Sequence, residues 1–267
     1  MERIRSLQIR QNEYGYDPFG FNREDAKPAI LVGRWLYEYY FRVKAFGVEN
    51  IPTGRVILAA NHSGQLPFDG LNIAAAVFFE GNPPRIPRAM LERFVPTLPY
   101  ASYLFSRWGQ VLGTPENCKR LLEDEEAILV FPEGVRGVSK PYSKRYQLQK
   151  FGLGFMRLAL ATKTPIVPVA VIGAEEQAPA INVKWLARLL NLPAFPLMPF
   201  PPFFPALPLP VRYYIYFGEP VYPKGDPDDD DKKIQRSVKQ LRLSIESMIW
   251  LGLDTRKSVF RRSERTK

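Results

Sequence analysis

Histidine and cysteine are almost absent from this chain. Its 267 residues contain one histidine, His62, and one cysteine, Cys118. A single cysteine excludes an internal disulfide framework and is consistent with a reducing compartment. One residue of each type is too few for a transition-metal site, and a carboxylate-bound Mg²⁺ is the only metal that the composition leaves open. We therefore predict no metal and no cofactor.

Long hydrophobic runs are missing as well. No stretch with a helical pattern is long enough to span a bilayer, and residues 1–10 alternate charges with single apolar residues, unlike a signal peptide. Hydrophobic residues still make up 46% of the chain, which is enough for a full core. We predict one domain over residues 28–253, after an N-terminal polar segment at residues 1–27.

Negative charge is in deficit. Lys and Arg total 37 against 27 Asp and Glu, for a net charge of +10. This excess predicts an anionic partner, which could be nucleic acid, an anionic membrane or a phosphorylated substrate. Part of it lies in a predicted basic tail, residues 254–267, which has little to bury. Aromatic residues are not interleaved with the basic ones, so we predict no nucleic-acid partner.

Strand and helix patterns alternate along the chain. Apolar, β-branched runs predict strands, and helical patterns begin at residue 28 and lie between and after the strands. This alternation predicts a single α/β domain whose central sheet is mostly parallel and flanked by helices. The expected strands cover residues 56–60, 85–90, 127–131, 165–172 and 211–217.

Two segments have more apolar surface than a soluble domain needs. A helix predicted over residues 28–44 carries Trp35, Tyr39 and Tyr40, which suits the membrane interface. An uncharged, proline-rich loop covers residues 189–211, and its prolines exclude a spanning helix. Alternatively, the helix packs on the core and the loop covers an apolar groove. We predict a peripheral protein on the cytoplasmic face of a membrane, in contact with membrane lipids and an anionic bilayer surface.

The only histidine lies in a predicted strand-to-helix loop. Asn61 and His62 follow the strand at 56–60, and Asp69 falls in the first turn of the next helix. A carboxylate there can accept a hydrogen bond from the imidazole, fix its tautomer and raise its basicity for proton transfer. The alternative is a loop histidine beside an aspartate that favours a helix N-terminus. These residues alone leave both readings open.

A second polar loop follows the predicted strand at 127–131. It contains Glu133, Gly134 and Arg136, with Lys140 and Lys144 close behind. Loops after parallel strands gather on one edge of the sheet, where α/β proteins bind ligands. We therefore expect Glu133 and Arg136 near His62, in a cationic patch suited to phosphate. A simple turn with surface charges is the alternative.

Together, the two loops resemble the lysophospholipid and glycerol-phosphate acyltransferase family (1-acylglycerol-phosphate acyltransferase-like). The resemblance covers residues 47–218 and rests on Asn61-His62 with Asp69, on residues 131–136, and on residues 166–169. It implies that His62 is the base and Asp69 its partner, and that Glu133 and Arg136 help to bind the acceptor. The donor would be an acyl thioester of coenzyme A or acyl carrier protein. The candidate substrate-binding residues are Asn61, Glu133, Gly134, Arg136, Lys140 and Lys144.

The chain departs from the family pattern in two places. Six residues separate His62 from Asp69 where four are usual. Seven positions along a regular helix rise about 10.5 Å, so the pair meets only if the loop doubles back. Residues 109–117 contain no Arg, whereas phosphate-acceptor members carry one there. Neutral lipid or alcohol acceptors therefore stay open.

The chain also lacks a Gly-x-Ser-x-Gly nucleophile elbow. This favours direct attack of the acceptor hydroxyl on the thioester over an acyl-enzyme. Backbone N–H groups near Gly134 or at the start of the Asp69 helix are two possible oxyanion sites. The competing interpretations are a non-catalytic basic membrane-binding protein and a lipid esterase or thioesterase.

Overall fold

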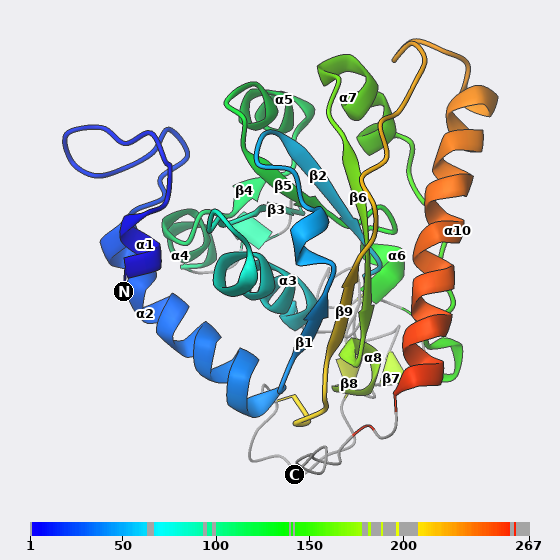
Figure 1. Ribbon diagram of the computed structural model, residues 1–267, viewed down its shortest axis with the longest axis horizontal. Helices are drawn as coiled ribbons and strands as arrows, with labels where there is room; N and C mark the ends of the chain where they lie inside the picture. The colour runs from blue at the N-terminus through cyan, green and yellow to red at the C-terminus, as the bar shows by residue number, and fades with distance from the viewer. Residues whose placement is uncertain are drawn as a thin grey trace.

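A seven-stranded sheet forms the centre of the molecule (Figure 1). Five neighbouring strands, from β6 to β4, run parallel to one another; β9 is antiparallel to β6 and parallel to β1. This confirms the predicted α/β domain with a mostly parallel sheet. In sheet order the strands are β1 (Lys44–Phe46), β9 (Tyr214–Phe217), β6 (Ile166–Ile172), β2 (Val56–Ala60), β5 (Ala127–Val130), β3 (Arg88–Leu91) and β4 (Val111–Leu112).

The coordinates are a computed structural model, and they describe most of the chain. The described residues are 2–62, 67–92, 95–97, 100–138, 140, 142–177, 181–182, 188, 196–197, 208–256 and 259. Most of the predicted loop 189–211 lies outside them, as do most residues of the predicted tail 254–267. Two short strands, β7 (Ile181–Asn182) and β8 (Pro196–Leu197), form a separate antiparallel pair.

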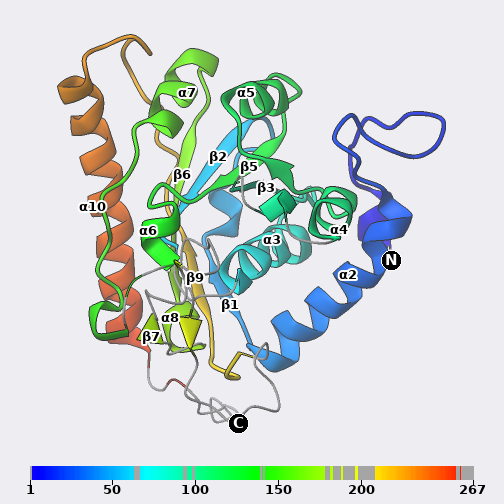
Figure 2. The ribbon, with the colours of Figure 1, turned by 180° about the vertical axis from the view of Figure 1, so that it is seen from behind.

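Helices cover both faces of the sheet (Figures 1 and 2). One face packs against α3 and a π-helical stretch after α2, and the other packs against α5, α7 and α10. Alternate residues of β2 enter the two cores, as side chains of a pleated strand must. The helices are α1 (Glu2–Arg5), α2 (Arg23–Trp35), α3 (Phe68–Glu80), α4 (Ala101–Arg107), α5 (Pro115–Glu123), α6 (Val135–Val138), α7 (Gly154–Thr162), α8 (Ala174–Gln177) and α10 (Asp231–Thr255).

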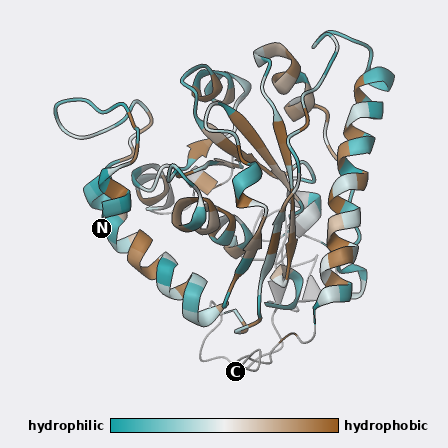
Figure 3. Cartoon of the chain, in the orientation of Figure 1, coloured by the Kyte–Doolittle hydropathy of each residue, from teal (hydrophilic) through white to brown (hydrophobic). Residues whose placement is uncertain are grey.

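The central strands are apolar because both of their faces are covered. Every residue of β2 and β6 is buried, and strands of this kind read as continuous hydrophobic runs. Figure 3 shows this hydrophobic centre, with polar and apolar residues alternating along α10. The buried stripe of α10 has the spacing of one helical face and includes Ile234, Val238, Leu241, Ile245 and Ile249.

Two helices begin at other residues than the pattern predicted. Helix α2 begins at Arg23 rather than Pro28, because the Asn22 side chain accepts hydrogen bonds from the N–H groups of Glu24 and Asp25. Pro28 lies inside α2, where its ring replaces one hydrogen-bond donor. The spacing of Leu148, Phe151, Phe155, Leu158 and Thr162 predicts one helical face, but α7 begins at Gly154. The buried Leu148 and Phe151 therefore belong to the loop before it.

Among the residues that the structure describes, no helix has the length and apolar character needed to cross a bilayer. The helix pattern predicted for residues 28–44 is divided between α2 and the π-helical stretch Leu36–Tyr40. Helix α2 joins the N-terminal segment to the domain, because Ala26 shares a small core with Ile4, Leu7 and Phe21.

Candidate active site

His62 and Asp69 form a hydrogen-bonded pair. Nδ1 of His62 lies 2.7 Å from Oδ2 of Asp69, although six residues separate them. The pair therefore meets despite the longer spacing between the two residues. Asp69 is fully buried, and its second oxygen accepts the N–H of Gly70 at 2.7 Å. A carboxylate at Nδ1 places the imidazole proton there and leaves Nε2 as the basic nitrogen.

The imidazole is also held on its face. The Phe131 ring stacks on it with centroids 4.1 Å apart and an interplanar angle of 21°. Behind the histidine, a Cβ added at Gly137 would lie 2.8 Å from both Cβ and the carbonyl oxygen of His62. Only glycine fits so close an approach. Our sequence analysis assigned no role to either residue, although both flank the Glu133 loop.

Glu133 ties the histidine loop to two other segments. Its side chain is fully buried; Oε1 accepts the backbone N–H of His62 at 3.1 Å, and Oε2 accepts that of Gln149 at 2.6 Å. The carboxyl ends of β2 and β5 thus meet, and Glu133 reaches His62 as expected. Its proposed part in acceptor binding stays a prediction, because both oxygens have backbone donors here.

The predicted cationic patch is divided between surface and interior. Arg136 and Lys144 are exposed, whereas the Lys140 side chain is only 4% exposed. Its Nζ lies 3.1 Å from Oε1 of Glu175 and 3.7 Å from Oε2 of Glu133. Lys140 therefore already has two protein carboxylates as neighbours, while the two exposed cations remain accessible to an anionic substrate.

Two further candidate residues have backbone partners. The Asn61 side chain donates to the Val171 carbonyl at 3.0 Å and accepts the Val171 N–H at 2.7 Å, joining β2 to β6. Gly134 has a φ of +55°, in the left-handed region that favours glycine. Its N–H donates to the Phe131 carbonyl at 2.9 Å. A substrate-binding role for either residue stays a prediction.

A third strand end contributes two buried glutamates that our sequence analysis missed. Glu175 and Glu176 lie on α8, directly after β6. Oε1 of Glu175 accepts the Tyr146 N–H at 2.9 Å. Burial raises the pKa of the Glu175 carboxyl, against the opposing effects of Lys140 and this N–H. The sequence could have identified these two residues as candidates, because both follow a predicted strand just as His62 and Glu133 do.

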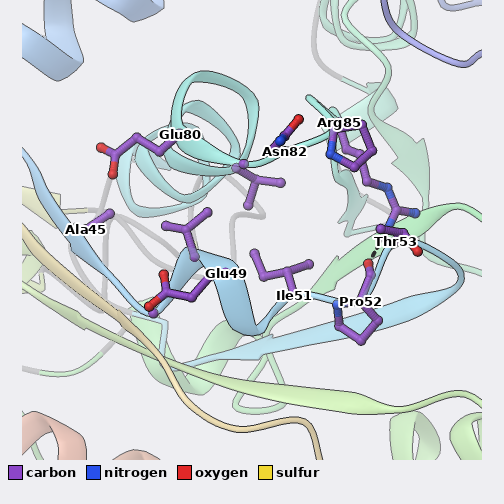
Figure 4. A pocket seen from close by; sticks show the side chains of 13 residues that line it. Ala45, Glu49, Ile51, Pro52, Thr53, Glu80, Asn82 and Arg85 are labelled. Atoms are coloured by element: carbon purple, nitrogen blue, oxygen red, sulfur yellow. Dashed lines mark hydrogen bonds between the residues drawn. The ribbon is translucent and has the colours of Figure 1, made fainter.

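A pocket of about 280 Å³ lies away from this constellation, at the end of α3 opposite Asp69 (Figure 4). Two of its charged lining residues already have protein partners. The Arg85 guanidinium donates to the carbonyls of Pro52 and Gly54 at 2.8 and 2.7 Å, and Glu80 accepts the Tyr37 hydroxyl. Neither His62 nor Asp69 lines this pocket.

Comparisons with known proteins agree with this geometry. The Acyltransferase family model matches residues 42–172, a range that contains His62, Asp69 and Glu133. An uncharacterised protein of Mycobacterium tuberculosis is 39% identical over 259 residues, which cover 93% of this chain and 71% of that protein. The chain therefore belongs to the acyltransferase family, which confirms both the resemblance and the prediction of an acyltransferase.

Two further matches are more distant. The Mus musculus protein called DGAT1/2-independent enzyme synthesizing storage lipids is 25% identical over 202 residues, or 73% of this chain and 58% of that protein. The crystal structure of the 1-acyl-sn-glycerophosphate (LPA) acyltransferase PlsC from Thermotoga maritima aligns with a TM-score of 0.56. It is 18% identical and covers 87% of this chain and 81% of its own. The second match shows a shared fold.

Proposed function

We propose that this protein transfers a fatty acyl group from an acyl thioester of coenzyme A or acyl carrier protein to a lipid hydroxyl. The acceptor is a lysophospholipid, glycerol-phosphate or a related lipid alcohol, and the reaction takes place at the cytoplasmic face of a membrane. The observation that carries the proposal is the 2.7 Å bond between the only histidine and a fully buried carboxylate. The mouse relative, an enzyme synthesizing storage lipids, and the Thermotoga enzyme, a 1-acyl-sn-glycerophosphate acyltransferase, support a lipid substrate.

The pair supplies the proton transfers that the reaction needs. Nε2 of His62 removes the proton from the acceptor hydroxyl as its oxygen attacks the thioester carbonyl, and Asp69 stabilises the resulting imidazolium. The C–O bond of the new ester forms, the C–S bond breaks, and the imidazolium returns the proton to the leaving thiolate. A positioned base of this kind contributes about 10²–10⁴-fold to the rate.

Substitution of the pair tests this mechanism. We expect His62→Ala to lower acyl transfer by about 10²–10⁴-fold without unfolding the protein. Asp69→Asn should also lose much activity, because an amide holds the wrong imidazole tautomer. The assay follows thiol release and ester formation with donor and acceptor varied separately.

Asp17→Asn is the matched control, because Asp17 is also buried but pairs with Arg88 instead. It should lower stability and leave the rate per folded molecule unchanged. Near-normal turnover by a folded His62→Ala variant would show that His62 is not the base. Thioester cleavage that needs no acceptor would favour the thioesterase interpretation, and vesicle binding without any cleavage would favour the non-catalytic one.

Arg136 provides a test of the acceptor. If this exposed cation binds an acceptor phosphate, Arg136→Ala removes a charge-assisted hydrogen bond of about 1.5–3 kcal/mol. The KM for a phosphorylated acceptor should then rise by about one to two decades, and the donor KM should change little. Arg236→Ala, an exposed arginine on α10, is the control. Equal effects on both substrates, or a preference for neutral acceptors, would contradict this assignment.

A further inference from the structure

Two buried carboxylates share one lysine beside the histidine loop. Lys140 lies between Glu175 and Glu133, with Nζ to oxygen distances of 3.1 and 3.7 Å, and also donates to the Gln147 carbonyl at 3.3 Å. The three charged side chains are 4%, 5% and 0% exposed. Charges so thoroughly removed from water are retained only when each has close partners.

The cluster leads directly to His62. Glu133 accepts the His62 backbone N–H through one oxygen, and its other oxygen lies near Lys140. Glu175 accepts the Tyr146 N–H through the same oxygen that faces Lys140. A continuous set of contacts therefore runs from α8, after β6, through the lysine to the backbone of the histidine. It ends on the backbone N–H of His62, whereas Asp69 binds the ring of the same residue.

Charge explains why the lysine is needed. Without it, Glu133 and Glu175 would be like charges in a buried space with no cation between them, which is unfavourable. Burial already raises the pKa of Glu175, the Glu133 charge acts in the same direction, and Lys140 opposes both. An ionised Glu133 makes a stronger, shorter bond to the His62 N–H than a protonated one.

We propose that Lys140 and Glu175 are positioning residues for the acyl transfer. They hold the Glu133 carboxylate against the His62 N–H and so set the position of the catalytic imidazole. This inference rests on the proposed function, in which His62 is the base. It also gives Lys140 a different role from the substrate binding that the sequence predicted.

The neighbouring residue Glu176 provides a matched control. It lies on the same helix and its side chain is similarly buried, at 6% exposed. Its carboxylate faces Arg256 at 2.8 Å and accepts the Tyr146 hydroxyl. Within the described part of the chain it has no ion pair with Lys140. Glu176→Gln therefore removes a buried charge from α8 without touching the contacts that lead to Glu133.

The first experiment observes His62 directly and needs no substrate. Because the chain has one histidine, ¹⁵N-histidine labelling produces a single backbone amide signal in the full-length protein. We expect Lys140→Met and Glu175→Ala to shift this signal and to speed its hydrogen exchange at least about tenfold. Glu175→Gln keeps the accepting oxygen and should restore most of the protection, and Glu176→Gln should leave the signal unchanged.

A double variant keeps the experiment decisive if Lys140→Met does not fold. Lys140→Met with Glu175→Gln removes both charges at similar volume, and buried pairs often tolerate such replacement. Its His62 amide should still exchange faster than that of Glu175→Gln alone. A His62 signal that is unaltered in folded Lys140→Met or in the double variant would overturn the proposal, as would an equal change in Glu176→Gln.

Kinetics separates positioning from substrate binding. A displaced base costs up to about 10²-fold, so Lys140→Met should lower kcat about 10- to 100-fold and leave both KM values within about twofold. An unchanged kcat with a raised acceptor KM would show a substrate-binding lysine and overturn the positioning role. If the wild type transfers no acyl group but the His62 amide responds as described, the proposed function fails while the positioning of His62 stands.

Discussion

At the scale of single residues, His62 is held from three directions. Asp69 accepts from its ring, Phe131 stacks on its face, and Glu133 accepts from its backbone N–H. These partners come from α3 and from the loop after β5, so they restrain the histidine loop from two elements. In the proposed mechanism, an imidazole held in this way needs little reorganisation before it takes a proton.

Gly137 is the residue whose replacement should disturb this arrangement most directly. Gly137→Ala places a methyl group 2.8 Å from two His62 atoms, and either the loop after β5 or the histidine must move. We expect at least about a tenfold loss of transfer activity, because a small misplacement of a catalytic group is costly. Initial rates and urea unfolding measure the two effects.

Gly33→Ala is the control for this substitution. Gly33 lies inside α2, and a Cβ there meets nothing within 4 Å. Replacement of a helical glycine by alanine should raise the free energy of unfolding by about 0.5–1 kcal/mol and leave activity unchanged. Wild-type rates in Gly137→Ala would contradict this prediction, because they would show that His62 can move to accept the methyl group without loss of activity.

At the scale of elements, α2 and the π-helical stretch after it have the features of both alternatives for the predicted helix: one face packs on the core, and another is exposed and apolar. Leu36 and Tyr37 are buried in the core against α3, as the packing alternative requires. A second face leaves large apolar side chains exposed, as a membrane contact requires. We call this the α2 apolar face; it consists of Leu31, Val32, Trp35 and Tyr39, which are 58%, 58%, 52% and 68% exposed.

This element also ends close to the candidate active site. Phe41, directly after the π-helical stretch, packs on Phe68 with ring centroids 5.3 Å apart. Phe68 is the first residue of α3 and precedes Asp69. A bilayer that receives the α2 apolar face would therefore lie near the His62–Asp69 pair, as the proposed transfer to a lipid acceptor requires.

At the scale of the whole molecule, the net charge of +10 and the α2 apolar face predict two contributions to membrane binding. Each basic residue near an anionic surface contributes about 1 kcal/mol, which salt screens. The apolar contribution is not screened. We expect flotation with anionic vesicles at low salt, and weaker but persistent binding at high salt.

Substitution of two aromatic residues separates the two contributions. Trp35→Ser with Tyr39→Ser should make vesicle binding far more salt-sensitive. Tyr14→Ser with Tyr222→Ser is the control, because these tyrosines are about as exposed as Trp35 and Tyr39. Tyr222 also lies far from His62: its neighbour Val221 bridges to Ile166 at the start of β6, whereas His62 follows the other end of the sheet. A wild-type protein that stays in solution with anionic vesicles at low salt would refute the peripheral attachment.

Much of the fold and the contact between His62 and Asp69 was predictable from sequence, because both depend on local patterns; the catalytic role of the pair stays a prediction. Apolar runs such as Val56–Ala60 and Ile166–Ile172 identify strands buried on both faces. The rule that loops after parallel strands share one edge then brings His62 and Glu133 together. The start of α2 was missed because the side chain of Asn22, rather than the ring of Pro28, determines it.

The sequence by itself determined the α/β class, five of the seven strands of the central sheet and the position of the single histidine; the short strands β1 and β4 were not predicted. Only the tertiary structure decided which charges are buried. The sequence around Lys140 does not distinguish it from the neighbouring cations Arg136 and Lys144. Of the three, only Lys140 is buried, because Glu175, just after β6, lies beside it. The burial of a charge depends on partners distant along the chain, and no local pattern of residues contains that information.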